Sequence, residues 1–166
     1  MPIVNIVRGD ILNAEEEFIA HQCNCFSVRA QGLAKTIFER YPSADVYSSR
    51  KRRAAAVRSD KSVLPLGSVT IHPVDDRRSI INMYAQLAPG ACGDYLSEVF
   101  VTEETAGERL KWFSQCLEDI ARQCPADARI AMPEKIGCGL AGGNVEDYHG
   151  LLTACPLNIV LYVYDE

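Results

Sequence analysis

Four glycines lie close together in the stretch MPEKIGCGLAGGN at residues 132–144, namely Gly137, Gly139, Gly142 and Gly143. Glycine loses more backbone entropy on folding than any other residue, so a cluster of it indicates unusual dihedral angles or the close approach of another group to the main chain. A flexible turn is the commoner role of a glycine-rich segment taken alone. Close approach is the chemically informative alternative, because exposed backbone N–H groups bind anions.

A second stretch with chemical potential is IAHQCNC at residues 19–25, which places His21 and Asn24 three residues apart. An imidazole titrates near neutral pH, which suits general acid–base catalysis. An amide such as that of Asn24 can both donate and accept hydrogen bonds. Residues three apart face opposite sides of an ideal strand, so a bend or the strand's end must bring both to one ligand. A buried histidine with satisfied hydrogen bonds is the alternative role for His21.

The same stretch spaces His21, Cys23 and Cys25 as potential metal ligands on one strand face. Zinc needs a fourth ligand, and the other cysteines lack the C-x-x-C spacing of structural sites. We therefore predict no metal and no cofactor, with small apolar thiols packed in the core. Cys138 alone lies in a candidate ligand loop, where a helix N-terminus would lower its pKa, but the sequence offers no identifiable base as its partner.

Strands and helices alternate along the chain. Short β-rich runs predict strands at 3–7, 18–24, 67–74, 79–85, 128–133 and 157–165, and one-face apolar spacing predicts helices from 32 to 41, at 103–123 and at 144–155. The strand runs are too apolar to have one face in water, so they indicate an α/β fold with a mixed, mostly parallel sheet covered by helices on both faces. No linker is long enough to divide residues 1–166 into two domains.

The two stretches described above both lead from a strand toward a helix that starts near a glycine, which favours an anion site. Ligands of open α/β sheets lie beyond the carboxyl ends of the strands. Unpaired N–H groups and the positive end of a helix dipole attract phosphate there. The lysine and serine of a Walker-type loop are absent, and no dinucleotide-binding fingerprint follows the first strand. A P-loop ATPase and a dehydrogenase are therefore disfavoured.

Composition bounds the remaining possibilities. The 166 residues carry a net charge of −5, and no run reaches the ~18 apolar residues that a membrane span needs. Seven cysteines without a recognisable export signal indicate reduced thiols and a cytoplasmic location, with a nuclear one as the alternative. The acidic balance disfavours general nucleic-acid binding. The basic run at 50–61 is either a solvated surface or a patch that touches phosphates or an acidic partner.

Six segments in this order carry a family resemblance: RGDIL, IAHQCNC, GLAKTIFERYP, LGSVTI, IINMYAQ and MPEKIGCGLAGGNVEDY. Together they resemble a macro domain, and more narrowly the branch that includes ADP-ribose 1″-phosphate phosphatases and hydrolases of terminal ADP-ribose. The resemblance covers nearly the whole chain, and its most specific parts are IGCGLAGG and the H-x-C-N-C segment. It implies a three-layer α/β/α domain that binds ADP-ribose in a crevice at the top of the sheet.

The resemblance assigns ligand contacts to particular positions. An aspartate after the first strand bonds the adenine amino group in the family; Asp10 matches it, with Ile11 beside it to pack on the ring. The family's asparagine after the second strand reaches the distal ribose, and Asn24 matches it. The two phosphate loops are matched by Gly32 and Leu33 in one, and by Gly137, Cys138, Gly139, Leu140 and Ala141 in the other.

The first phosphate loop departs from the family pattern. Relatives usually carry glycines where this chain has Arg29, Ala30 and Gln31 before Gly32. The departure implies a stiffer and bulkier loop, which either tightens the distal site or lets Arg29 contact a phosphate.

The catalytic positions also depart. The glycohydrolases of this branch use a lysine and an aspartate where this chain has Gln86 and Ala141, so that mechanism has no residues here. The phosphatase group carries a histidine at the position of His21. His21 and Asn24 are therefore the expected catalytic residues.

The resemblance implies an ADP-ribose-binding domain that hydrolyses a terminal ADP-ribose derivative, with ADP-ribose 1″-phosphate as the favoured substrate. Deacylation of O-acetyl-ADP-ribose or of ADP-ribosylated acidic side chains is the enzymatic alternative. A non-catalytic reader of ADP-ribose, free or attached to a protein, is the alternative of another class. The expected protein is a monomer without a membrane partner, and an interaction module using 50–61 is the least favoured possibility.

Overall fold

The computed structural model describes residues 4–27, 29–48, 50, 64–88, 90–92 and 104–164. Within them, six strands form one sheet in the order β1-β6-β5-β2-β4-β3. The strands are β1 (Val4–Arg8), β2 (Phe18–Cys23), β3 (Val69–Pro73), β4 (Ser79–Tyr84), β5 (Arg129–Pro133) and β6 (Asn158–Val163). Neighbouring strands are parallel except β3, which runs antiparallel to β4 at one edge.

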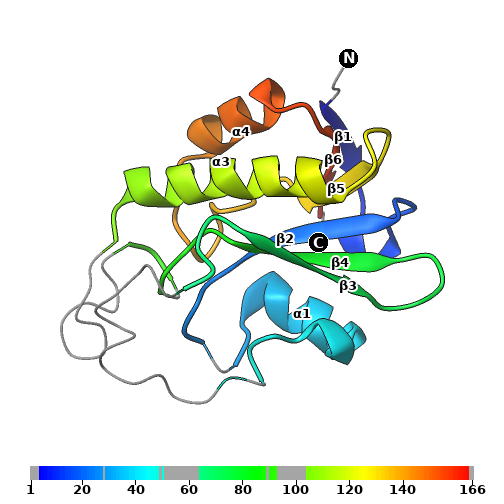
Figure 1. Cartoon of the computed structure of the whole chain (residues 1–166), viewed down its shortest axis with the longest axis horizontal. Helices are drawn as coiled ribbons and strands as arrows, with labels where there is room; N and C mark the ends of the chain where they lie inside the picture. Colours follow the sequence, from blue (N-terminus) through cyan, green and yellow to red (C-terminus); the bar gives the residue numbers. More distant parts are fainter. Residues whose placement is uncertain are drawn as a thin grey trace.

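Helices cover both faces of this sheet. The described helices are α1 (Gly32–Arg40), α3 (Ala106–Gln123) and α4 (Val145–Ala154), with short 3-10 turns at Ile11–Asn13 and Pro42–Ala44. Figure 1 shows α3 and α4 together on one side of the sheet and α1 on the other. The predicted three-layer α/β/α arrangement with a mixed, mostly parallel sheet is therefore confirmed. None of the described helices is long and apolar enough to cross a membrane.

Burial follows the position of each strand in the sheet. Five of the six residues of β2 and five of the six of β4 are buried, because both strands have a neighbour on either side and helices above and below. Their side chains are accordingly apolar on both faces. In β1, at the edge, four of the five residues are exposed.

The long helix α3 has a strong start signal. Thr105 accepts a hydrogen bond from the N–H of Glu108, and the Glu108 side chain accepts one from the N–H of Thr105. This reciprocal pair fixes the start of the helix at 106, three residues later than the sequence predicts. Phe113, Leu117 and Ile120 form its buried stripe. Of the predicted basic run at 50–61, only Arg50 lies among the described residues.

Candidate functional site

A cavity of about 590 Å³ opens where β2, β4 and β5 end. Three segments line it: the end of β2 with the chain that follows to α1, the residues after β4, and the loop after β5. The lining residues are His21, Gln22, Asn24, Ser27, Arg29, 31–34, Tyr47, Gln86, Gly90, Pro133 and 135–141. It therefore lies at the carboxyl ends of parallel strands, as the sequence predicts.

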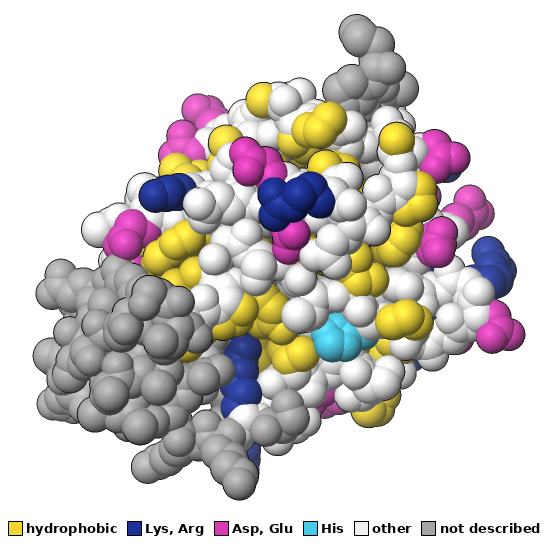
Figure 2. Space-filling view, viewed as in Figure 1, with side chains coloured by type: hydrophobic (Ala, Val, Ile, Leu, Met, Phe, Trp, Pro, Cys, Tyr) yellow, Lys and Arg dark blue, Asp and Glu magenta, His cyan; other side chains and the backbone are white. Residues whose placement is uncertain are grey.

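The charge of the cavity differs from that of the outer surface. Acidic and basic side chains are interspersed on the face drawn in Figure 2. The described residues that line the cavity include the cations Arg29 and Lys135 and no carboxylate. In a chain with a net charge of −5, this selective exclusion of acidic groups favours an anionic ligand.

The segment 134–143, here called the glycine loop, leaves backbone donors open. Cys138 N–H donates to the Lys135 carbonyl at 2.8 Å, and Gly142 N–H donates to the Gly139 carbonyl at 3.1 Å. Between these two turns, the N–H groups of residues 139–141 donate to no acceptor in the described part of the chain. All three residues line the cavity, so their N–H groups are available to a ligand.

The glycines of this loop serve two purposes. Gly137 has φ +75°, and a Cβ there or at Gly143 would overlap the ring of Tyr148. That ring is 2% exposed and packs edge-on against Phe113 with centroids 4.8 Å apart. A Cβ at Gly139, in contrast, would meet nothing within 4 Å. Gly137 and Gly143 are therefore required by packing, whereas the space beside Gly139 is free for a ligand.

The start of α1 faces the glycine loop. Gln31 is the N-cap residue, but its side chain makes no capping hydrogen bond. The first-turn residues Gly32, Leu33 and Ala34 line the cavity, so the positive end of this helix lies at its wall. A Cβ on Gly32 would lie 3.0 Å from Cδ1 of Leu140, which means that the start of α1 and the glycine loop approach each other closely.

Asn24 lies one residue beyond the end of β2, which is why it and His21 both line the cavity. Its Oδ1 accepts hydrogen bonds from the N–H groups of Phe26 and Ser27 at 3.0 and 2.8 Å. Arg50 donates to the carbonyls of Asn24 and Ser27 at 2.8 and 3.0 Å. These bonds hold the turn after β2 in one conformation.

His21 is 2% exposed and lies at the floor of the cavity. Its Nε2 is 2.6 Å from Oδ1 of Asn82, whose Nδ2 donates to the carbonyl of Ala44. Because Oδ1 can only accept, the proton is on Nε2 and the lone pair is on Nδ1. Burial lowers the pKa of His21 to about 4, against the opposing effect of the Asn82 hydrogen bond. The imidazole is therefore neutral at neutral pH.

A pair of amides lies beside His21, and no local sequence pattern predicts their contact. Gln22 Nε2 donates to Gln86 Oε1 at 2.7 Å, and Gln86 Nε2 donates to the carbonyl of Ala88 at 3.0 Å. The register that places β2 next to β4 creates this contact between residues 64 apart. The floor of the cavity therefore carries two uncharged amides. A lysine at the position of Gln86 would instead place a positive charge there.

Other predicted residues take different places. Asp10 accepts a hydrogen bond from Leu12 N–H at 2.9 Å and Ile11 is 5% exposed, and neither lines the cavity. The predicted lowering of the Cys138 pKa is wrong: burial, together with the charge of Asp147, raises it. A helix N-terminus nearby does not compensate for this desolvation.

Five of the six remaining cysteines are buried, as predicted for core thiols, whereas Cys92 is partly exposed. Cys23, Cys25, Cys116, Cys124 and Cys155 are buried, and none of the described cysteines forms a disulfide. Cys23 Sγ lies 3.7 Å from Nε2 of His21. No group of three or more potential metal ligands occurs in the described parts of the chain.

Comparison with known proteins adds to this geometry. No family model matches the chain. A protein of Enterobacteria phage T4, described as an uncharacterized 17.5 kDa protein in the tk-vs intergenic region, is 25% identical over 174 residues, which cover 98% of this chain and 96% of that protein.

Several solved structures superpose on the whole chain. The macrodomain of Mycobacterium tuberculosis DarG gives a TM-score of 0.64 at 19% identity and covers 98% of both chains. The macrodomain of Thermus aquaticus DarG gives 0.59 at 21% identity over 100% of both chains. A macrodomain protein from Streptomyces coelicolor gives 0.60 at 17% identity, over 98% of this chain and 100% of that one. This chain therefore has the macrodomain fold.

Proposed function

We propose that the cavity binds ADP-ribose, with the diphosphate held between the glycine loop and the start of α1. One observation carries this proposal: open N–H groups from two facing loops line a cavity that contains two cations and no carboxylate among its described residues. A volume of about 590 Å³ also falls within the range of cavities that hold small-molecule ligands.

The proposed contacts follow the family resemblance. Residues 137–141 wrap the diphosphate from one side, and Gly32 and Leu33 approach it from the other. Asn24 lies at the end that would receive the distal ribose. The adenine would extend past the cavity lining toward Asp10 and Ile11, with the Asp10 carboxylate accepting from its amino group.

Calorimetric titration with ADP-ribose tests this proposal. Gly139→Val should fold normally, because its Cβ meets open space, yet lose at least roughly tenfold in affinity because its branches occupy the place of a phosphate. Gly150→Val on α4 is the matched control, since its Cβ also meets nothing within 4 Å and it lies outside the cavity lining. Absence of heat from the wild type at high ligand concentration, or ordinary affinity in Gly139→Val, would reject the placement.

We propose in addition that the chain hydrolyses ADP-ribose 1″-phosphate, with His21 and Asn24 at the reaction centre. The observation that favours it is that a neutral imidazole and the Asn24 amide border the same cavity. A water would attack phosphorus while Nδ1 of His21 takes its proton. The bond between phosphorus and the ribose oxygen then breaks, the imidazolium returns the proton to that oxygen, and the products are ADP-ribose and phosphate.

Phosphate release, compared between the wild type and His21→Ala, tests the catalytic assignment. We expect a loss of about 10²-fold or more in turnover, with ADP-ribose affinity retained as the check on folding. Unchanged turnover in the variant would remove His21 from the mechanism. A wild type that binds ADP-ribose without releasing phosphate would be a reader, or a deacylase if it releases acetate from O-acetyl-ADP-ribose.

A further inference from the structure

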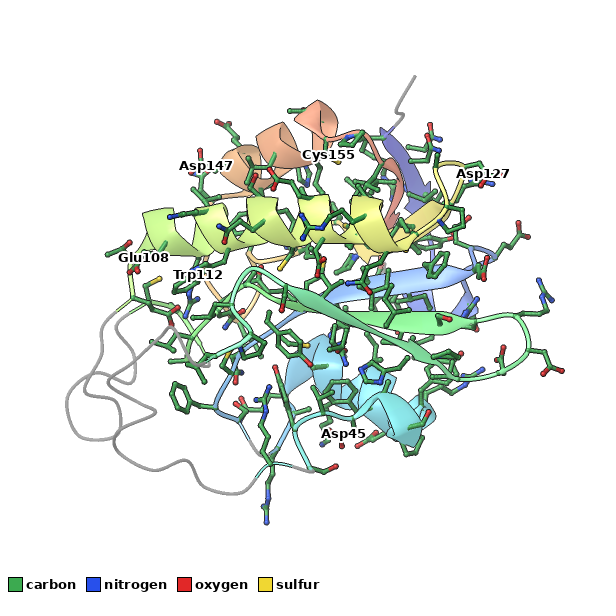
Figure 3. All side chains as sticks on the ribbon, in the orientation of Figure 1. Asp45, Glu108, Trp112, Asp127, Asp147 and Cys155 are labelled. Atoms are coloured by element: carbon green, nitrogen blue, oxygen red, sulfur yellow. The ribbon has the colours of Figure 1, made fainter. Side chains whose placement is uncertain are left out.

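A buried ion pair joins the start of α3 to the chain beside the cavity. Arg109 is 2% exposed, and its Nη2 and Nε donate to the two carboxylate oxygens of Glu104 at 2.6 and 3.0 Å. The same carboxylate accepts the backbone N–H groups of Leu87 and Ala88 at 2.8 and 2.9 Å. The pair lies next to the first turns of α3, where Figure 3 labels Glu108 and Trp112.

The remaining donors of Arg109 reach the main chain of two lining segments. Nη1 donates to the carbonyl of Gly90 at 2.8 Å and to that of Ala141 at 3.1 Å, and Nη2 also donates to the carbonyl of Ala88 at 3.1 Å. Gly90 and Ala141 both line the cavity, one after β4 and the other in the glycine loop. One guanidinium therefore links the main chain of both lining segments.

The position of Ala141 makes this contact relevant to binding. Residues 139–141 carry the N–H groups that face no acceptor within the described part of the chain, and Ala141 is the last of them. A carbonyl held on the far side by Arg109 sets the plane of the following peptide and limits rotation of the loop around it. A buried ion pair is itself weak support for stability, because desolvation offsets much of the attraction. Its geometric effect on the two loops is the clearer contribution.

We infer that Arg109 is a positioning residue that holds the glycine loop in the conformation that binds a diphosphate. The inference rests on the proposed binding of ADP-ribose and names a residue outside the cavity lining on which it depends. Arg109 touches neither the ligand nor a reacting atom. It acts through the carbonyl of Ala141.

Arg109→Lys is the informative variant. A lysine keeps a positive charge beside Glu104, but its single ammonium cannot also reach Gly90 and Ala141 in the directions of the guanidinium fork. We expect the affinity for ADP-ribose to fall by about tenfold or more, and the affinity for adenosine, which lacks the diphosphate, to stay unchanged. Calorimetry measures the first ligand and chemical-shift titration the second.

Two further variants separate positioning from loss of stability. Asp119→Asn is the matched control, because Asp119 also lies in α3 and accepts a backbone N–H, that of Val69 at 2.9 Å, away from the cavity. Glu104→Gln weakens the ion pair but leaves Arg109 its bonds to Gly90 and Ala141. Both should lower the midpoint of urea unfolding and retain the wild-type ratio of ADP-ribose to adenosine affinity.

The outcomes distinguish this inference from the proposed function. If the wild type binds no ADP-ribose, the proposed function fails and the inference fails with it. If the wild type binds and Arg109→Lys loses no more affinity than Asp119→Asn, or loses both ligands equally, the inference alone is overturned. Should Arg109→Lys not fold, Arg109→Gln takes its place in the same comparison, and an unchanged ratio of ADP-ribose to adenosine affinity in that variant would overturn the inference.

Discussion

Gly137 and Gly143 both lie against the Tyr148 ring, whereas Gly139 faces open space. The sequence pattern predicts a glycine-rich loop at this place but does not separate these roles. The separation depends on Tyr148, whose position in the first turns of α4 folds its ring back under the loop. Two of these glycines are therefore required by packing, and the third leaves room for a ligand.

His21 makes stability depend on pH. Its pKa is about 4 in the folded chain against an ordinary value of 6.5, so between these pH values the unfolded chain binds more protons. The contribution of His21 to the free energy of unfolding should therefore be fully present above pH 6.5. As the pH drops from 6.5 toward 4, the free energy of unfolding should fall by about 3 kcal/mol in all. The pKa of His72 is also lowered by burial, which adds loss in the same direction.

Urea unfolding between pH 4 and 7 checks this prediction. In His21→Gln, which retains a donor for Asn82 but does not titrate, the pH slope should flatten. An equal slope in the wild type and the variant would mean that His21 does not remain neutral in the folded chain.

At the scale of elements, the three described helices differ in how they begin. Thr105 caps α3, and the Asn144 side chain caps α4 by accepting the N–H of Asp147 at 3.1 Å. Only α1, which begins at the cavity wall, lacks a side-chain cap among these three. A free helix start costs stability, and its position beside the glycine loop is consistent with a ligand that satisfies it.

Replacing Gln31 by serine should stabilise the fold and weaken the binding of ADP-ribose. A serine hydroxyl at the N-cap accepts an N–H of the first turn, which should raise the free energy of unfolding by about 0.5–1 kcal/mol. The same bond removes a donor from the diphosphate, so the affinity for ADP-ribose should fall. Gln31→Ala is the control, since it removes the side chain and supplies no cap. Equal affinity in the serine and alanine variants would contradict this role of the α1 start.

The sequence predicts the elements better than the contacts between them. Short apolar, β-rich runs place all six strands within about two residues of their observed bounds. For the inner strands β2 and β4 the reason is burial on both faces, which demands continuous apolar side chains. The same patterns do not predict which strands pair with β2. The contact between Gln22 and Gln86 therefore becomes visible only in the strand register of the structure. The sequence does not predict the burial of Arg109 either, because an arginine in the first turns of an amphipathic helix ordinarily faces water.

The candidate site was predictable in part. The glycine loop and the α1 start follow from residue types, since small residues and helix starts suit anions. The burial of His21 depends on Asn82 and Phe38, which belong to distant elements. The raised pKa of Cys138 likewise depends on how deeply the loop packs, which no local pattern encodes.

Across the whole molecule, an acidic protein lines its cavity with the cations Arg29 and Lys135. The affinity for ADP-ribose should therefore fall as salt rises, because charges near the surface are screened beyond about 10 Å at 0.1 M salt. Lys135→Gln should weaken binding by about two- to fivefold at low salt and flatten this dependence.

Lys111→Gln is the control for overall charge. Lys111 is exposed on α3, outside the cavity lining, and its replacement changes the net charge by the same amount. Calorimetric titrations at several salt concentrations compare the two variants. Equal losses in both would assign the effect to the general field of the protein rather than to the cavity.

The central place of β2 has a consequence for synthesis. Its neighbours β4 and β5 come from residues 79–84 and 129–133, so the strand leaves the ribosome long before either can pair with it. At about 5–20 residues per second, the nascent chain carries the FIAHQC segment without its partners for several seconds. Nearly all of this segment is buried in the folded molecule, so its apolar side chains stay uncovered during that time, and the cavity cannot form before the loop that follows β5 has been synthesised.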